Sequence, residues 1–200
     1  MIETDWRFNS LEERRAFFKE TITPIVGQAC AEMMEYKGFL TAPASKGHHI
    51  NYEGGLFDHS VEVALQLQSL TDKLCLVWEA EDSAFRVGVL HDLCKIDTYK
   101  KVVDKPEIIS LDFGLEVCIP EEFHYEWDNS PIIKGHGDKS VIYALNWGCP
   151  LTDEEIACIT YHMGAYETDR WDAFSNAIKR FPNVLYTHTA DMIADKIMGV

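Results

Sequence analysis

The stretch FRVGVLHDLCK, residues 85–95, decides how the fold is interpreted. Its mostly apolar first part predicts a buried helix, and His91 and Asp92 follow directly at the end of that helix. An ionised aspartate in such a place costs free energy unless it is paired or binds a metal ion. The imidazole offers a nitrogen ligand, and the carboxylate offers oxygens that can bridge two ions. A mixed nitrogen and oxygen set suits Mn, Fe, Co, Ni or Zn better than Ca.

Helical patterns extend over most of the remaining chain. Ser10 with Glu13, and Thr152 with Glu155, have the spacing of capping boxes, which open helices. Residues 41–57 are rich in Gly, Pro, Ala and Ser and predict a loop. Apolar residues recurring every three or four positions predict helices over residues 11–36 (bent at Pro24), 58–76, 79–93, 139–147, 156–162, 171–181 and 184–197.

The pattern changes between residues 98 and 120. Two β-prone pieces, residues 99–103 and 115–119, are separated by polar residues and predict a small hairpin. We therefore expect an all-α fold of about seven helices with a small β-hairpin insertion, in a single domain over residues 1–200. A chain of this length buries roughly 70% of its unfolded surface, so it needs neither disulfides nor a metal ion merely to fold.

Charge and cysteine usage limit the partners. Thirty-three acidic residues against 18 Lys and Arg give a net charge of −15, which disfavours binding to long nucleic acid. The six cysteines form no CxxC pair, which is typical of buried thiols in a reducing compartment. The charged first residues lack the apolar core of a signal peptide, and no apolar run approaches the roughly 18 residues of a membrane span. We expect a cytoplasmic protein without a membrane partner.

Four segments place histidine or aspartate near predicted helix ends, and a fifth places Asp191 within the last helix: GGLFDHS at His59, GVLHDLCKIDTY at His91 and Asp92, GHGDKS at His136, YHMGAY at His162, and HTADMIAD at Asp191. Together they resemble the ordered H…HD…H…H…D signature of the HD-domain metal-dependent phosphohydrolase superfamily. The resemblance covers about residues 43–197 and is specific for the superfamily rather than for a substrate. It implies an HD-domain helical bundle and hydrolysis of phosphate esters.

The resemblance also implies the metal ligands, namely His59, His91, Asp92, His136, His162 and Asp191. His59, His91, Asp92 and Asp191 would hold a first divalent ion, which would be Mn, Fe, Ni, Co, Mg or Zn. His136 and His162 would hold a second ion with Asp92 bridging, or contact substrate beside a single ion. Binuclear members commonly have a further histidine where this chain has Met163, and a thioether is a poor ligand for a hard ion. The number of ions therefore stays open.

The expected chemistry is attack of metal-activated water on phosphorus. Asp92, Lys95, His136 and His162 are the catalytic candidates, and Lys95 would neutralise charge on the transition state. Glu62, one helical turn after His59, is a candidate to orient that imidazole. Side chains placed near the motifs are the candidates for substrate binding, and they are His49, Lys139 and Trp127.

The substrate is expected to be small and phosphorylated, either a nucleotide or a short oligonucleotide. Residues 42–60, APASKGHHINYEGGLFDHS, are similar to the segment that leads into the catalytic domain of HD-type 3′-to-5′ exoribonucleases, so an exoribonuclease-like phosphodiesterase is one alternative. Monoesterase, diesterase and triphosphohydrolase activities all use the same activated water. A non-catalytic nucleotide-binding HD sensor is the alternative from a different class. The sequence does not indicate an oligomeric state.

Overall fold

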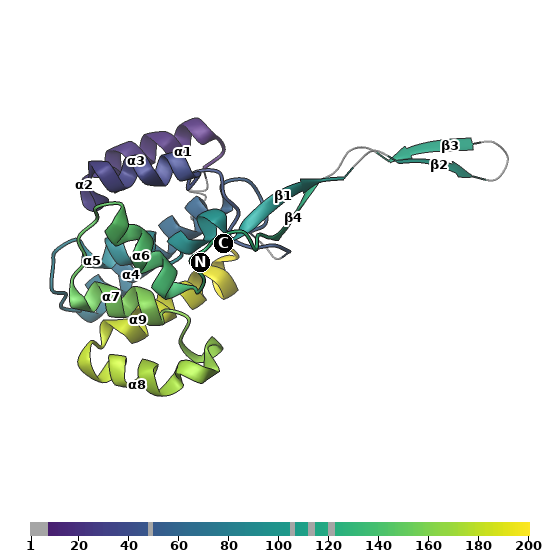
Figure 1. Ribbon diagram of the computed structural model, residues 1–200. Helices are drawn as coiled ribbons and strands as arrows, with labels where there is room; N and C mark the ends of the chain where they lie inside the picture. Colours follow the sequence, from purple (N-terminus) through teal and green to yellow (C-terminus); the bar gives the residue numbers. More distant parts are fainter. Residues whose placement is uncertain (1–7, 48–49, 105–106, 112–114, 120–122) are drawn as a thin grey trace.

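The computed structural model describes residues 8–47, 50–104, 107–111, 115–119 and 123–200. These residues are mostly helical, which confirms the predicted helical class, and Figure 1 shows the helices packed into one body. Among them, no helix has the length and apolar content to cross a membrane. The helices are α1 (Leu11–Phe17), α2 (Thr23–Val26), α3 (Gln28–Lys37), α4 (Gly55–Leu74), α5 (Ser83–Leu90), α6 (Gly137–Asn146), α7 (Asp153–Tyr161), α8 (Trp171–Arg180) and α9 (Asn183–Ile193).

The first helical region breaks at Gly27 rather than bending at Pro24. A π-helical turn, Phe18–Ile22, follows α1, and Pro24 lies in the first turn of α2, where its missing N–H is not needed. Gly27 has φ +87° and ψ 150°, so the chain leaves the helix there and α3 begins afresh. The prediction of one helix over residues 11–36 is wrong at this point, because glycine adopts a backbone conformation that other residues avoid.

Helix α4 begins at Gly55, three residues before the predicted start at Asp58. Gly54 precedes it with φ +92°, and a Cβ atom there would lie 2.4 Å from Cζ of Arg14, so the position requires glycine. Asp58 instead lies inside the helix, where it accepts two hydrogen bonds of 3.0 Å from Arg14 and one from the hydroxyl of Tyr52. This buried ion pair joins α1 to α4.

Helix α4 is the centre of the hydrophobic core and packs mainly against α5 and α9. Gly88 of α5 approaches Ala64 of α4 so closely that the two backbones nearly touch. On the other side, five phenylalanine rings form a cluster under α1: Phe8, Phe17, Phe18, Phe39 and Phe57. Burial of each large apolar side chain contributes about 1.5–3 kcal/mol, so the core does not depend on a bound ion.

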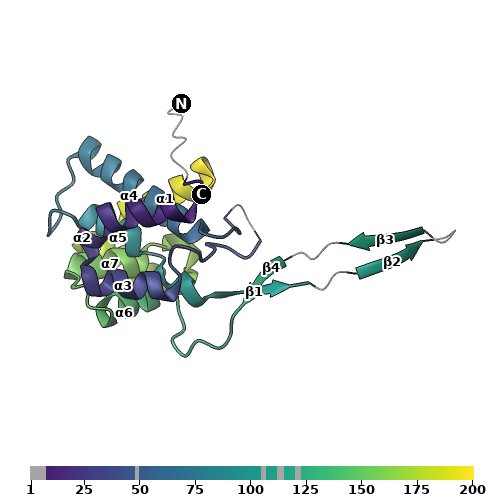
Figure 2. The same ribbon diagram turned by 90° about the horizontal axis from the view of Figure 1, so that it is seen from above.

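The β-structure is an arm of two small antiparallel sheets. Strand β1 (Tyr99–Val103) pairs with β4 (Phe123–Trp127), and β2 (Glu107–Leu111) pairs with β3 (Leu115–Ile119). Figures 1 and 2 show both sheets projecting away from the helices. The two predicted pieces, residues 99–103 and 115–119, do not pair with each other, and the strands that pair with them, β4 and β2, were not predicted. The missed strand β4 has the two-residue alternation of FHYEW, in which the aromatic residues fall on one face.

Candidate metal centre

The six predicted ligands meet at one place in the helical body, although they come from five segments of the chain. His59 and Asp191 lie within α4 and α9. The other four lie at helix ends, because His91 and Asp92 follow α5, His136 precedes α6 and His162 follows α7. All six side chains are mostly buried, His136 least, with 27% of its side chain exposed. The helix packing, rather than a loop, therefore positions these groups.

One half of the cluster is built around the Nε2 atoms of His59 and His91, which are 3.2 Å apart. Oδ1 of Asp191 lies 3.2 Å from the first of these nitrogens and 3.8 Å from the second. Oδ2 of Asp92 lies 3.5 Å from Nε2 of His59 and 3.4 Å from Nε2 of His91. Two nitrogens and two carboxylate oxygens thus converge on a small volume, and such a set suits a divalent transition metal.

The other half of the cluster faces the second oxygen of Asp92. Its Oδ1 atom lies 2.8 Å from Nε2 of His136 and 3.5 Å from Nε2 of His162. All three atoms are buried, and within the described residues none of them makes a hydrogen bond of good geometry, although His136 and Asp92 lie at ion-pair distance. Buried polar atoms usually make well-formed hydrogen bonds, so three of them facing one another could hold a cation. Asp92 thereby offers one oxygen to each half.

The histidine rings are held so that their Nε2 atoms face the cluster. Nδ1 of His59 lies 2.9 Å from the backbone oxygen of Val200, and the Nδ1 atoms of His91 and His162 each lie 2.7 Å from a carbonyl oxygen one turn earlier. A carbonyl oxygen accepts but cannot donate, so these three Nδ1 atoms carry the proton. In its neutral form each ring presents an unprotonated Nε2, which is the form that binds metal ions.

Charge pairing within the cluster perturbs its titrating groups. Burial alone would raise the pKa of Asp92, but Lys95 and the surrounding histidines hold that pKa well below its usual range. The ammonium of Lys95 lies 2.5 Å from Oδ2 of Asp92, and the pKa of Lys95 is raised against the effect of its burial. Burial likewise opposes charge on His59, yet Asp191 and Asp92 raise its pKa to about 9. Asp92 and Asp191 therefore stay ionised inside the cluster, and their carboxylates favour a cation.

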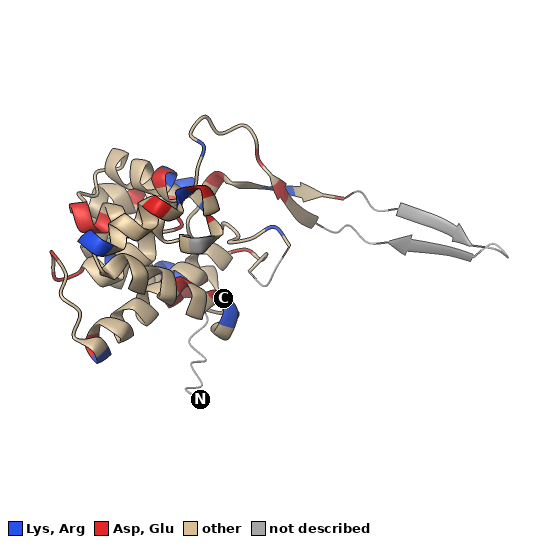
Figure 3. Cartoon of the chain, turned by 90° about the horizontal axis from the view of Figure 1, so that it is seen from below, with Lys and Arg blue, Asp and Glu red and all other residues tan. Residues whose placement is uncertain are grey.

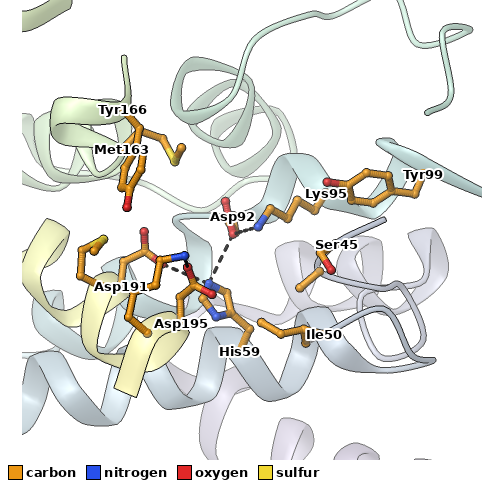
Figure 4. A pocket seen from close by; sticks show the side chains of 13 residues that line it. Ser45, Ile50, His59, Asp92, Lys95, Tyr99, Met163, Tyr166, Asp191 and Asp195 are labelled. Atoms are coloured by element: carbon orange, nitrogen blue, oxygen red, sulfur yellow. Dashed lines mark ion pairs between the residues drawn. The ribbon is translucent and has the colours of Figure 1, made fainter. Parts of the chain in front are cut away.

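A cavity of about 410 Å³ opens in front of the first half of the cluster. Figure 4 shows Asp92 between His59 and Lys95, with Tyr99 beyond the lysine. The walls combine aromatic, apolar and charged side chains, namely Ala44, Ser45, Ile50, Tyr99, Met163, Tyr166, Met192, Asp195 and Lys196. The cavity has the size and mixed lining of a small-molecule site. Met163 forms part of this wall. It stands where binuclear HD-domain members commonly have a histidine.

Neither of the two predicted substrate-binding residues that the structure describes, Lys139 and Trp127, lines this cavity. Lys139 is buried and pairs with Asp97, outside the residues that line the cavity. Trp127 is half exposed at the base of the arm, where its ring lies 5.0 Å from that of Tyr99, a lining residue. His49 lies outside the described residues. Sequence proximity to a motif was the signal for Lys139, and its helical position turns the side chain toward Asp97 instead.

Other residues of the centre were missed or misassigned from sequence. His59 is anchored by Val200 rather than by Glu62, whose Oε1 accepts a hydrogen bond from Gln66. No sequence signal marks Val200, because the contact joins residues 141 positions apart. The cavity residue Tyr166 lies inside the quoted YHMGAY segment and could have been included on that basis.

In comparisons with family models, curated proteins and solved structures, nothing matched this chain.

Proposed function

We propose that this chain is an HD-domain phosphohydrolase that uses two divalent metal ions to hydrolyse a phosphate ester of a nucleotide or a short oligonucleotide. The proposal combines the ordered motifs with the geometry of the cluster. The observation that carries it is the set of three buried atoms that make no hydrogen bond of good geometry, Asp92 Oδ1, His136 Nε2 and His162 Nε2, opposite a second set around His59 and His91.

The donor set fits the proposed ions. Imidazole nitrogens held in the correct tautomer and carboxylate oxygens with lowered pKa values are ligands for Mn, Fe, Co, Ni or Zn, and the bridging position of Asp92 accounts for a pair. Such ions, when bound, lower the pKa of water toward about 7 and polarise a phosphoryl oxygen. His59, His91, Asp92 and Asp191 would hold the first, and Asp92, His136 and His162 the second.

The chain itself supplies charge and shape for the substrate. Lys95 lines the cavity beside Asp92, where its ammonium can neutralise a phosphate oxygen as charge develops. Tyr99 and Tyr166 add aromatic surface to the same cavity, on which a base can stack at a gain of about 1–3 kcal/mol. The volume of about 410 Å³ limits what is enclosed to a ligand of roughly mononucleotide size.

The charge distribution favours a short substrate. The chain carries a net charge of −15, and Figure 3 shows acidic and basic residues intermingled on the helical body in that view. A long phosphate backbone is bound through many Lys and Arg contacts that release counterions. A mononucleotide or short oligonucleotide requires only the metal centre and one or two cations such as Lys95 and Lys196, which both line the cavity.

The test is metal-dependent hydrolysis by the purified chain. Metal-free protein is reloaded with Mn, Mg, Co, Ni or Zn, and hydrolysis of bis-p-nitrophenyl phosphate is measured, followed by nucleoside mono-, di- and triphosphates, cyclic nucleotides and short RNA. Elemental analysis gives the number of ions bound. We expect two ions and turnover that requires them.

Variants separate the site from the remaining fold. Asp92→Ala and Asp92→Asn should lose both metal and turnover, whereas Asp138→Ala removes a surface carboxylate that pairs with Arg170 and should behave like the wild type. Circular dichroism confirms that each variant is folded. Full metal content in folded Asp92→Ala would refute the ligand assignment. Stoichiometric metal with nucleotide binding but without hydrolysis of any substrate would refute the enzyme and favour the sensor.

A further inference from the structure

His136 differs from the other histidines of the cluster in what holds its ring. Its Nδ1 atom lies 3.6 Å from the sulfur of Cys94, whereas the Nδ1 atoms of His59, His91 and His162 face backbone oxygens. Cys94 is fully buried, two residues after Asp92. The thiol therefore occupies the place that a carbonyl oxygen takes at the other three rings.

A second link ties Cys94 to the same histidine. The backbone N–H of Cys94 donates to Oγ of Ser140 at 3.0 Å, and that hydroxyl donates to the backbone oxygen of His136 at 3.3 Å. Ser140 is itself fully buried on the first turn of α6. Cys94 therefore contacts the ring of His136 directly and its backbone through Ser140. Cys94 lies on the short 3₁₀ helix Leu93–Asp97, which follows Asp92.

The chemistry of sulfur gives this contact a consequence. A carbonyl oxygen only accepts hydrogen bonds, so the Nδ1 atom that faces it must donate. A thiol can donate or accept, so it leaves both choices open to Nδ1. In the neutral ring of His136, Nε2 is unprotonated only when Nδ1 carries the proton and its N–H donates a hydrogen bond to the sulfur of Cys94. Only that arrangement lets Nε2, which already faces Asp92 Oδ1 at 2.8 Å, act as a ligand.

We propose that Cys94 is a positioning residue for the second metal ion, holding His136 through Nδ1 with the help of Ser140 and without being a ligand itself. This inference rests on the binuclear centre of the proposed function. Partners that orient a ligating histidine change metal affinity about tenfold to a hundredfold when they are removed. We therefore expect the second ion, and not the first, to depend on the thiol.

The test is a cobalt titration of metal-free protein followed by absorption spectroscopy, because Co²⁺ reports both occupancy and ligand type. Wild type, Cys94→Ala and Cys94→Ser are compared with Cys30→Ala, which removes an equally buried thiol on α3, outside the cluster. Thermal unfolding confirms that each variant folds. If Cys94→Ala does not fold, Ser140→Ala cuts the second link and is titrated in its place.

The expected result is two ions in the wild type, an about tenfold to hundredfold weaker second ion in Cys94→Ala, and a smaller loss in Cys94→Ser, whose hydroxyl can still accept from Nδ1. The first ion and the Cys30→Ala variant should be unchanged. An unchanged second ion in Cys94→Ala, or an equal loss in Cys30→Ala, would overturn the inference. A sulfur-to-cobalt charge-transfer band that Cys94→Ala abolishes would also overturn it, since the thiol would then be a ligand. A wild type that binds fewer than two ions would instead refute the binuclear centre.

Discussion

Gly88→Ala would test whether the close packing of α5 on α4 sets the metal geometry. A Cβ atom at this position would lie 2.3 Å from Cα, 2.5 Å from N and 2.8 Å from Cβ of Ala64, whereas ordinary contacts begin near 3.4 Å. The neighbouring atoms are backbone and cannot rotate away. The two helices would therefore have to separate by about 1 Å, judged from the same contacts.

Two effects of this separation can be given magnitudes. Overpacking costs about 1–3 kcal/mol and the better helix propensity of alanine returns about 1 kcal/mol, so a net loss of up to about 2 kcal/mol is expected. That corresponds to a fall in Tm of up to about 8 °C for a chain of this size. The carbonyl of Gly88 also anchors His91, so a shift of about 1 Å exceeds the roughly 0.2 Å tolerance of metal–ligand distances. First-ion affinity should fall at least about tenfold.

The assay combines thermal unfolding of the metal-free protein with metal titration against a competing chelator. Gly47→Ala is the control, because a Cβ atom there meets nothing within 4 Å among the described residues. The control should match the wild type in both measurements. A Gly88→Ala variant with wild-type Tm and wild-type metal affinity would show that α4 and α5 do not position His91 in the way described.

Three further predictions concern the second ion, protons and substrate length. Gly137→Ala would place a Cβ atom 2.3 Å from the oxygen of Ile159 and 2.5 Å from that of Thr160. This clash would push α6 away from α7 and separate His136 from His162, so elemental analysis should show loss of the second ion before the first. The pKa of His59 is raised to about 9 without metal, so an ion must displace the proton of His59 below that pH. Calorimetry should therefore show metal affinity rising about tenfold per pH unit up to about pH 9. An affinity that does not change with pH would contradict this. Specificity constants for RNA should not rise beyond about ten nucleotides, and a steep, salt-sensitive rise would refute the short-substrate proposal.

The helical class could be predicted because it depends on local patterns, whereas the set of ligands was implied by the resemblance to HD-domain phosphohydrolases. Apolar periodicity located most helices, and the capping box of Thr152 and Glu155 forms as predicted. The break at Gly27 could not be distinguished from a bend at Pro24, since both residues interrupt helices and only the backbone dihedrals show which one does so.

Contacts between distant segments were not predictable from the sequence. A bridging Asp92 was one of the two arrangements that the resemblance implied, but the division of its oxygens between two histidine pairs depends on how α5, α6 and α7 pack. The burial of Lys139 against Asp97 also depends on that packing. A motif reports which residue types are present, whereas the direction of each side chain follows from tertiary structure.

The wide spacing of the ligands along the chain has a consequence for the order of events during folding. His59 and Asp191 are separated by 132 positions, yet their side chains are 3.2 Å apart. Contacts between such distant positions form late, because a long loop must close before they can be made. A nascent chain that still lacks α9 has no complete site. The ion would therefore bind after the domain has folded, and it would stabilise the folded state rather than direct folding.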